Sequence, residues 1–399
     1  MTLALRDPAV ALPSGPAAAA HPRGQAPPAS GGRERSTSTA APRLVSLDVF
    51  RGFVIGSMLL VNNLIWNAGT PRQLMHAPWG SGITFTDMIL PWFVFIIGVT
   101  IPVSASSGRS REGGRAARAV RVVRRAALLV ALGVALDAVE YRRFTVGMDV
   151  LQLLGLAYLV AAPLGRAPVA VRLGCAAALL GAYAALIAFV PPPGYPAGTL
   201  DPAHNIIRYV DDTYLARFQL AGVLTVAPAA ALALVGTAAG EFLLARGITQ
   251  GAKVGAFVLA GASLVLAGDF WARGLPASKD LWTPSYAVIA AGLGALLLAT
   301  CTLLFDVVRL RALAFPFAVL GSNAIVGYLG SALLAIGAMQ GWSVPVAQGR
   351  SLSLHSAVLD PLGQRVGPVQ AGWMYTLAVM GLWWLVLFAL YRKRLFIRV

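Results

Sequence analysis

The sequence predicts an all-α, polytopic integral membrane protein with about ten transmembrane helices and both termini in the cytoplasm. Hydrophobic residues make up 57% of the 399 residues and charged residues only 12%, whereas a soluble domain carries about 25% charged residues. The mean hydropathy is +0.71. Apolar stretches recur along the whole chain, each close to the roughly 20 residues that span a bilayer.

Hydropathy divides the chain into ten apolar segments. Their predicted ranges are 50–66, 84–104, 126–140, 149–165, 173–190, 220–243, 254–272, 286–304, 313–339 and 372–391. The third segment is short for a membrane span, so the count is about ten. An even number of spans puts both termini on the same side of the membrane.

The distribution of positive charge sets the predicted orientation. The net charge is +16, but Lys and Arg gather in the segments of one side, above all in "RSREGGRAARAVRVVRR" (109–125) and the closing "RKRLFIRV". Cytoplasmic loops of membrane proteins are enriched in Lys and Arg. The charge therefore indicates a topology with both termini cytoplasmic, and not binding of nucleic acid.

Residues 1–43 are predicted to form a disordered cytoplasmic tail, and residues 44–399 a single transmembrane domain. The tail is rich in Ala, Pro, Gly and Arg and has no apolar run, so it cannot bury enough surface to offset its ordering entropy. It also lacks the apolar core of a cleaved signal peptide. Cys175 and Cys301 lie inside predicted spans, and two thiols with four histidines give no metal-ligand pattern.

The first group of polar residues lies where the chain enters the membrane, in "SLDVFRG". Asp48 and Arg51 are three residues apart and share a face of a helix. One interpretation is a local ion pair with Ser46 as the helix N-cap. The other has Arg51 facing inward, where a guanidinium holds a phosphate in a two-pronged contact.

The second group lies in "VNNLIWNAGTPRQLMHAPWGSGITFTD". Asn62 and Asn63 end the first span, a loop rich in Gly, Pro and Trp contains His76, and Thr84 with Asp87 matches a capping box. Taken by itself, Asp87 is explained by helix capping, and His76 taken by itself is an ordinary histidine at the membrane interface. Together they bracket one hairpin at the outer membrane face, where ionisable groups mark function. Imidazole is also the side chain that titrates nearest physiological pH.

Other polar and aromatic residues lie at or inside the predicted spans. Arg124 and Arg125 begin the third span, where they would reach an anionic ligand from the cytoplasm. Trp282 and Tyr286 are expected to be aromatic anchors at the membrane interface. Asn323 lies deep in the ninth span, and its amide needs either a structural hydrogen bond or a ligand contact.

Taken together, these segments resemble the heparan-α-glucosaminide N-acetyltransferase family, and most of all its bacterial members, which lie in gene clusters for N-acetylglucosamine use. The resemblance covers roughly residues 44–399. The blocks around His76 and in "WTPS" are the most specific. The segments that carry it, in the family's order, are "SLDVFRG", "VNN", "HAPWGSGITFTDMILPWFVFIIGV", "DVLQLLGLAYLVAA", "GVLTVAPAAALALVGTAAG", "KDLWTPSYAV", "LGSNAIVGYL" and "LYRKRLFIRV".

The resemblance implies a transmembrane acyltransferase of the bacterial inner (cytoplasmic) membrane. Acetyl-CoA is the co-substrate on the cytoplasmic side, the acceptor is an amino sugar on the periplasmic side, no metal takes part, and the family suggests a homodimer. Bacterial members often have Arg after the Gln of "VLQ", where this chain has Leu153, and "DPEG" where it has "QLAG" (219–222). These departures leave the hairpin untouched.

The resemblance also suggests roles for the hairpin. His76 occupies the position of the family's essential histidine and is expected to act as general base, a contribution of about 10²–10⁴-fold. Asn62, in the family's "VN" motif, would donate to the oxyanion, and Asp87 would fix the tautomer of His76. Direct transfer is the favoured route, and an acetyl-histidine intermediate stays open. The expected acetyl-CoA contacts are Arg51, Arg124, Arg125, Asn323 and Trp282.

The main alternative function is a secondary transporter for an amino sugar or a related small solute. Ten spans and a polar hairpin fit a permease. However, many transporters have internal repeats with matched interrupted helices, whereas the polar positions here concentrate in the first two spans. A scaffold or sensor role is disfavoured because the predicted loops are short. Sugar-dependent release of coenzyme A indicates the enzyme, and accumulation of sugar without coenzyme A indicates the transporter.

Overall fold

A computed structural model describes residues 44–106, 114–144, 146–345 and 351–397. They belong to one compact unit, Ala40–Val399. The tail predicted for residues 1–43 lies outside the described residues.

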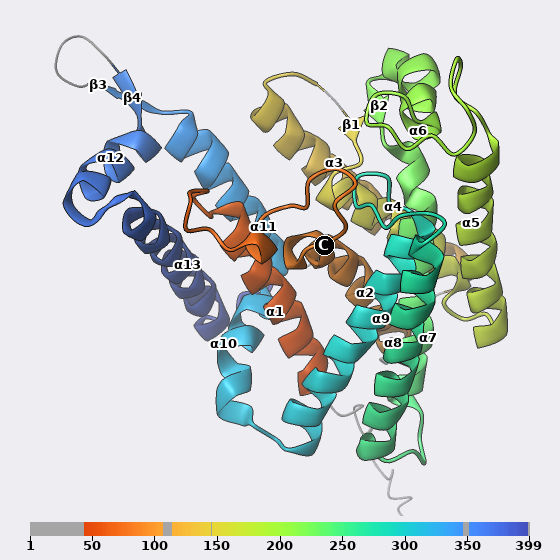
Figure 1. The fold of residues 1–399 in the computed structure, drawn as a ribbon. Coiled ribbons are helices and arrows are strands. Elements are labelled where there is room, and N and C mark those ends of the chain that lie inside the picture. The colour runs from red at the N-terminus through yellow and green to blue at the C-terminus, as the bar shows by residue number, and fades with distance from the viewer. Residues whose placement is uncertain (1–43, 107–113, 145, 346–350, 398–399) are drawn as a thin grey trace, which may run out of the picture. The chain divides into compact units, whose positions relative to one another are not determined.

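The described chain is mostly helical, as predicted (Figure 1). The longer helices are α1 (Val45–Asn62), α2 (Phe85–Ser106), α3 (Arg115–Tyr141), α4 (Val150–Leu164), α5 (Val169–Phe189), α7 (Val226–Leu244), α8 (Gln250–Ala272), α9 (Pro284–Cys301), α10 (Arg311–Ser322), α11 (Ala324–Leu333), α12 (Leu354–Val366) and α13 (Pro368–Arg392). The shorter helical pieces include η1 (Arg72–Leu74), α6 (Ile206–Val210), η3 (Asp211–Leu215), η4 (Ala216–Phe218), η5 (Val223–Thr225), η6 (Thr302–Val307) and η7 (Leu334–Gln340).

The structure also contains two short pairs of strands, which the all-α prediction did not include. β1 (Val146–Gly147) runs parallel to β2 (Leu220–Ala221), and β3 (Ser343–Pro345) runs antiparallel to β4 (Ser351–Ser353). Strands this short cannot form a sheet core. Their hydrogen bonds join loops to one another, so the fold class remains helical.

Each predicted membrane segment falls on helical chain, but fewer helices than ten are both long and apolar enough to span a bilayer. In the described chain seven helices meet that criterion, and the bent pair formed by 311–322 and 324–340 makes an eighth if it is one span. The third and fourth predicted segments correspond to α3, whose first half is arginine-rich, and to α4, which has 15 residues. A multi-pass membrane protein is confirmed, and the count of ten stays a prediction.

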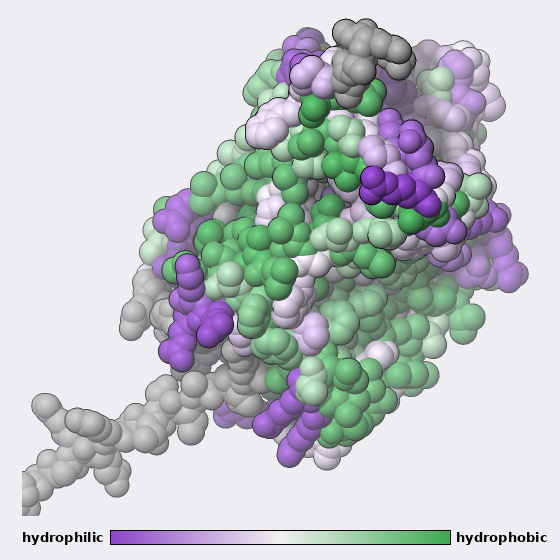
Figure 2. All heavy atoms as spheres, turned by 90° about the vertical axis from the view of Figure 1, so that its left-hand side faces the viewer, coloured by the Kyte–Doolittle hydropathy of each residue, from purple (hydrophilic) through white to green (hydrophobic). Residues whose placement is uncertain are grey.

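One face of the surface carries a broad apolar field of the kind that contact with a bilayer requires. Figure 2 shows one face with a broad hydrophobic field across its middle and hydrophilic groups gathered toward its margins. On α13 several large apolar side chains are exposed, among them Met374, Leu377 and Leu385. Exposed apolar surface on this scale suits contact with lipid.

Small residues let the central helices approach closely. The candidate spans in α1, α2, α7 and α9 are 56% to 61% buried, whereas those in α5, α8 and α13 are 22% buried. At the contact of α2 with α7, a side chain at Gly98 would collide with the Ala233 carbonyl, and one at Gly236 with the Phe95 carbonyl. Close backbone contact of this kind drives helix association in lipid.

The helices run alternately between two ends of this helical unit. We call the end with loops 63–84, 142–149 and 273–283 the hairpin end, and the end where α1 and α3 begin the arginine end. At the arginine end the backbone N–H of Ser46 donates to the Asp306 carboxylate over 3.4 Å. Ser46 lies inside α1 and makes no capping bond, so the predicted N-cap role is wrong.

The ninth predicted segment is broken, and Asn323 lies at the break. α10 and α11 meet there at an angle of 65°. The buried Asn323 side chain donates through Nδ2 to the Leu395 carbonyl over 3.0 Å and accepts from the backbone N–H of Ile397 over 2.8 Å. Both ends of its amide bond to the closing segment of the chain, which favours the structural interpretation of this residue over an acetyl-CoA contact.

Candidate functional site

A cavity of about 420 Å³ opens at the hairpin end, and we call it the first cavity. Its walls come from the end of α1, the start of α2, the loop before α4, the β2 segment and the loop before α9. Segments far apart in the sequence therefore contribute to one site. The polar and aromatic side chains that line it belong to Asn62, His76, Thr86, Asp87, Asp149, Thr225, Lys279, Asp280 and Trp282.

A histidine–aspartate pair lines the first cavity. Nδ1 of His76 lies 2.7 Å from Oδ1 of Asp87. The Asp87 side chain is 1% exposed, whereas the His76 side chain is 47% exposed. With Nδ1 bonded to the carboxylate, Nε2 is the ring nitrogen that can accept a proton, and Nζ of Lys279 lies 3.4 Å from it.

The second carboxylate oxygen of Asp87 caps α2. Oδ2 accepts from the backbone N–H of Thr84 over 2.9 Å and from that of Ala77 over 3.2 Å. The two interpretations of Asp87 are therefore compatible, because one oxygen caps the helix while the other holds the imidazole. Since Ala77 follows His76 directly, the same carboxylate fixes both the ring and its backbone.

The hairpin that carries His76 is attached to its surroundings at several points. The Thr84 hydroxyl donates to the Met75 carbonyl over 2.7 Å, and Gln73 accepts from the backbone N–H of Phe85 over 2.9 Å. The indole N–H of Trp79 donates to the Leu200 carbonyl over 2.8 Å. These bonds hold the loop against α2 and against the segment before α6.

The two adjacent asparagines have different surroundings. Asn62, the last residue of α1, is exposed and lines the first cavity with His76. Asn63 is buried, and its Nδ2 donates to the Leu59 carbonyl over 2.8 Å. The three residues predicted to be catalytic, Asn62, His76 and Asp87, thus line one cavity.

Lys279 lines the first cavity beside His76, although the sequence did not predict it as a site residue. Its Nζ lies 3.2 Å from Nδ1 and 3.4 Å from Nε2 of His76. Asp149 and Asp280 also line this cavity without having been predicted as site residues. In the sequence, these three residues were marked only by their positions at the ends of predicted spans. No sequence pattern indicates which loops lie next to one another in the fold.

Trp282 and Tyr286 lie in the protein interior, so their predicted role as interfacial anchors is wrong. Trp282 is buried in a left-handed backbone conformation (φ 47°) and lines the first cavity. The Tyr286 hydroxyl is fully buried and donates to the Asp87 carbonyl over 2.5 Å. Tyr286 therefore supports the start of α2 from α9, and the predicted contact of Trp282 with acetyl-CoA stays a prediction.

The predicted arginines lie away from His76, toward the arginine end. Arg51 forms the expected ion pair with Asp48 at 3.8 Å. The guanidinium of Arg125 lies 4.7 Å from the centre of the Tyr158 ring, and its buried Nε has no hydrogen-bond partner among the described residues. Arg124 is exposed. Since α3 begins at Arg115, Arg124 and Arg125 are its tenth and eleventh residues and, contrary to expectation, do not begin the helix. The three side chains offer positive charge in the halves of α1 and α3 that are nearer the arginine end.

Helix geometry gives the spacing between the two regions. Arg51 and Asn62 are eleven residues apart on α1, about 16 Å along the axis at 1.5 Å per residue. On α3, Arg125 precedes Asp137 by twelve residues, about 18 Å. Asp137 accepts from Gln152 of α4 over 2.6 Å, close to the cavity-lining Asp149. Both helices therefore lead from an arginine to the first cavity.

The chain matches the sequence model described as heparan-alpha-glucosaminide N-acetyltransferase, catalytic, over residues 43–269. This stretch contains the hairpin and the three arginines. It ends before Lys279, Trp282 and Asn323.

Two curated relatives extend the similarity over most of the chain. The heparan-alpha-glucosaminide N-acetyltransferase of Mus musculus is 25% identical over 427 residues, covering 90% of this chain and 61% of the relative. The heparan-alpha-glucosaminide N-acetyltransferase of Homo sapiens is 24% identical over 428 residues, covering 91% of this chain and 61% of the relative. The chain thus spans about three fifths of the length of these relatives. Since the family model matches more than half of it, the chain belongs to the heparan-α-glucosaminide N-acetyltransferase family, as its motifs predicted.

Proposed function

We propose that this protein is a membrane-bound N-acetyltransferase. It would move an acetyl group from cytoplasmic acetyl-CoA to the amine of an amino sugar on the periplasmic side of a bacterial inner membrane. The observation that carries the proposal is the accessible imidazole of His76, held by the buried carboxylate of Asp87 in a cavity that Asn62 also lines. The names of the two relatives support the reaction type.

In this reaction His76 acts as general base. The amine nitrogen attacks the thioester carbonyl carbon while Nε2 of His76 accepts a proton from the nitrogen. The C–S bond then breaks, and the imidazolium returns the proton to the leaving sulfur. Asp87 stabilises the imidazolium and holds Nδ1 in the correct tautomer. Direct transfer needs no covalent relay, because amine and thioester meet at one point.

Asn62 and Lys279 supply the electrostatic part of catalysis. The Asn62 amide donates to the oxyanion of the tetrahedral intermediate, where removing one donor costs about 10²–10³-fold. The Lys279 ammonium, 3.2 Å from His76, adds a positive charge where the leaving sulfur becomes negative. The exposed carboxylates of Asp149 and Asp280 accept hydrogen bonds from sugar hydroxyls and from the amine.

The arginine end would bind the nucleotide part of acetyl-CoA. Arg51, Arg124 and Arg125 provide charge for its phosphates. The distance of about 16 Å from Arg51 to Asn62 is then covered by the thin pantetheine arm, which lies between helices and presents the thioester at the hairpin end. We also propose that the chain crosses the membrane ten times with both termini in the cytoplasm, and that two copies form a homodimer.

Release of coenzyme A by purified protein tests the function. With acetyl-CoA and glucosamine, we expect amine-dependent release that His76→Ala abolishes while binding of acetyl-CoA persists. The proposal fails if no amine gives release and the protein does not bind acetyl-CoA. Accumulation of labelled glucosamine in vesicles without coenzyme A would then favour the transporter.

A further inference from the structure

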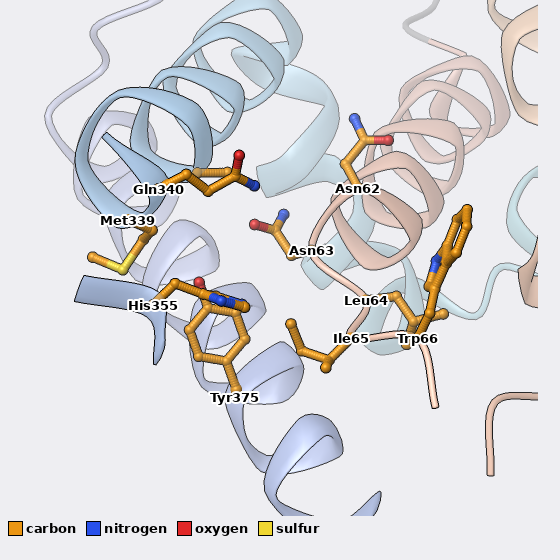
Figure 3. A pocket seen from close by; sticks show the side chains of 10 residues that line it. Asn62, Asn63, Leu64, Ile65, Trp66, Met339, Gln340, His355 and Tyr375 are labelled. Atoms are coloured by element: carbon orange, nitrogen blue, oxygen red, sulfur yellow. The ribbon is translucent and has the colours of Figure 1, made fainter. Parts of the chain in front are cut away.

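A second cavity of about 270 Å³ lies beside the first and shares Asn62 with it (Figure 3). Its walls come from the segment after α1, from η7, from α12 and from α13. Figure 3 shows the side chains of Asn63, just after α1, and Gln340, in η7, directed toward one another, with His355 and Tyr375 grouped on a further side. Asn62 thus lies between the two cavities, which places the second cavity next to the site of His76.

The lining of the second cavity combines flat rings with amides. Trp66 is 63% exposed at its rim, and the rings of His355 and Tyr375 pack edge to face with centroids 5.2 Å apart. Asn63 and Gln340 add amide groups that donate and accept hydrogen bonds. Aromatic faces contact the C–H faces of a pyranose, and amides pair with its hydroxyls. The cavity has room for one sugar ring.

The second cavity is also electrically neutral. Its lining residues in the described chain include neither Lys nor Arg, and neither Asp nor Glu. Burial lowers the pKa of the His355 imidazole below its ordinary value, which favours the uncharged form of this ring. A neutral lining does not compensate the charge of a sulfate or a carboxylate, and burying an unpaired charge is costly.

We infer that the second cavity is an acceptor subsite for a neutral sugar residue linked to the amino sugar that reacts in the first cavity. This inference rests on the proposed function and deepens it. The preferred acceptor would be an oligosaccharide with an amino sugar at its end and an uncharged neighbour. Gln340, His355 and Tyr375 lie outside residues 43–269, so these walls belong to the part of the chain that the family model does not match.

Three acceptors test the subsite in the full-length protein with acetyl-CoA. These are glucosamine, glucosaminyl-N-acetylglucosamine with a neutral neighbour, and glucosaminyl-glucuronic acid with an anionic neighbour. We expect kcat/KM for the neutral disaccharide to exceed that for glucosamine by about tenfold or more, a gain of about 1.4 kcal/mol. The anionic disaccharide should react no better than glucosamine.

Two tryptophans at this end provide a matched pair of variants. Trp66 lines the cavity, whereas Trp342 does not line it and is similarly exposed, at 66%. Trp66→Ala should lower kcat/KM for the neutral disaccharide about tenfold and that for glucosamine less, because it removes a stacking face. Trp342→Ala should leave both values within about twofold of wild type, a change of less than 0.5 kcal/mol in typical surface substitutions.

The inference is overturned if wild type uses the neutral disaccharide no better than glucosamine, if it prefers the anionic one, or if the two tryptophan variants behave alike. These outcomes leave the acetyltransferase itself intact. Should no amine be acetylated, equilibrium dialysis with the neutral disaccharide still decides. Saturable binding that Trp66→Ala weakens and Trp342→Ala does not would support the subsite, and absence of saturable binding would exclude it.

Discussion

Nδ1 of His76 lies 2.7 Å from Oδ1 of Asp87, and a second pair repeats this contact, with Nδ1 of His204 at 2.8 Å from Oδ1 of Asp201. The two pairs differ in the burial of the carboxylate. The Asp87 side chain is 1% exposed and the Asp201 side chain 50% exposed. Only the buried carboxylate is shielded from water, so it can hold an imidazole in one orientation. The exposed pair provides a matched control.

Asp87→Asn tests the orientation of His76. The amide cannot hold Nδ1–H as the carboxylate does, so we expect kcat to fall by about 10²–10⁴-fold. Binding of acetyl-CoA should persist. Steady-state release of coenzyme A measures the first quantity and equilibrium binding the second. Asp201→Asn is the control and should change kcat by less than about twofold; a similar loss in both variants would contradict the role of Asp87.

The adjacent asparagines allow a second comparison. Asn62→Ala removes an exposed cavity side chain and should lower kcat by about 10²–10³-fold with little change in Tm. Asn63→Ala removes the donor to the buried Leu59 carbonyl, which should cost about 1–3 kcal/mol of folding free energy. Thermal unfolding and initial rates measured on both variants separate a loss of catalysis from a loss of stability. A fall in Tm for Asn62→Ala that accounts for its lost activity would argue against an oxyanion role.

Lys279→Gln tests the charge beside His76. Because the ammonium would stabilise negative charge as the C–S bond breaks, we expect kcat to fall by about 10–10²-fold, with partial recovery in Lys279→Arg. Lys393→Gln changes an exposed lysine beyond α13 and serves as control. Equal activity of Lys279→Gln and wild type would remove Lys279 from the mechanism.

The sequence predicted most of the helices because hydropathy depends on local composition. The predicted segment 84–104 became Phe85–Ser106, and 372–391 became Pro368–Arg392. The break at Asn323 was missed because the apolar run continues through it, and what fixes the break is a contact with Leu395, 72 residues away. Hydropathy within a window contains no information on such a contact.

The site residues likewise divide into those close together in the sequence, which could be predicted, and those brought together only by the fold, which could not. Asn62, His76 and Asp87 lie within one hairpin, so their proximity follows from short sequence separation. Lys279 lies 203 residues from His76, and nothing in either loop indicates that the two meet. Trp282 was expected at an interface because aromatic residues gather there, yet its neighbours in space bury it.

The arginine end provides a fourth test. Arg125→Gln removes a guanidinium that stacks on Tyr158 from the first half of α3. We expect KM for acetyl-CoA to rise about tenfold with kcat nearly unchanged. Arg142 lies just beyond the other end of the same helix. The variant Arg142→Gln therefore controls for the loss of one positive charge. A rise in KM in both variants, or a fall in kcat alone, would contradict phosphate binding at Arg125.

His355 gives a pH-dependent prediction for the second cavity. Burial lowers the pKa of its imidazole, and Asp360 on the same helix offsets this only in part. The unfolded chain therefore binds a proton more readily than the folded protein, so the free energy of unfolding decreases as pH falls through about 6.5. We expect Tm to drop more between pH 7.5 and pH 5.5 in wild type than in His355→Gln, by a few degrees. Thermal unfolding at both pH values measures this, and identical slopes would show that His355 titrates as in the unfolded chain.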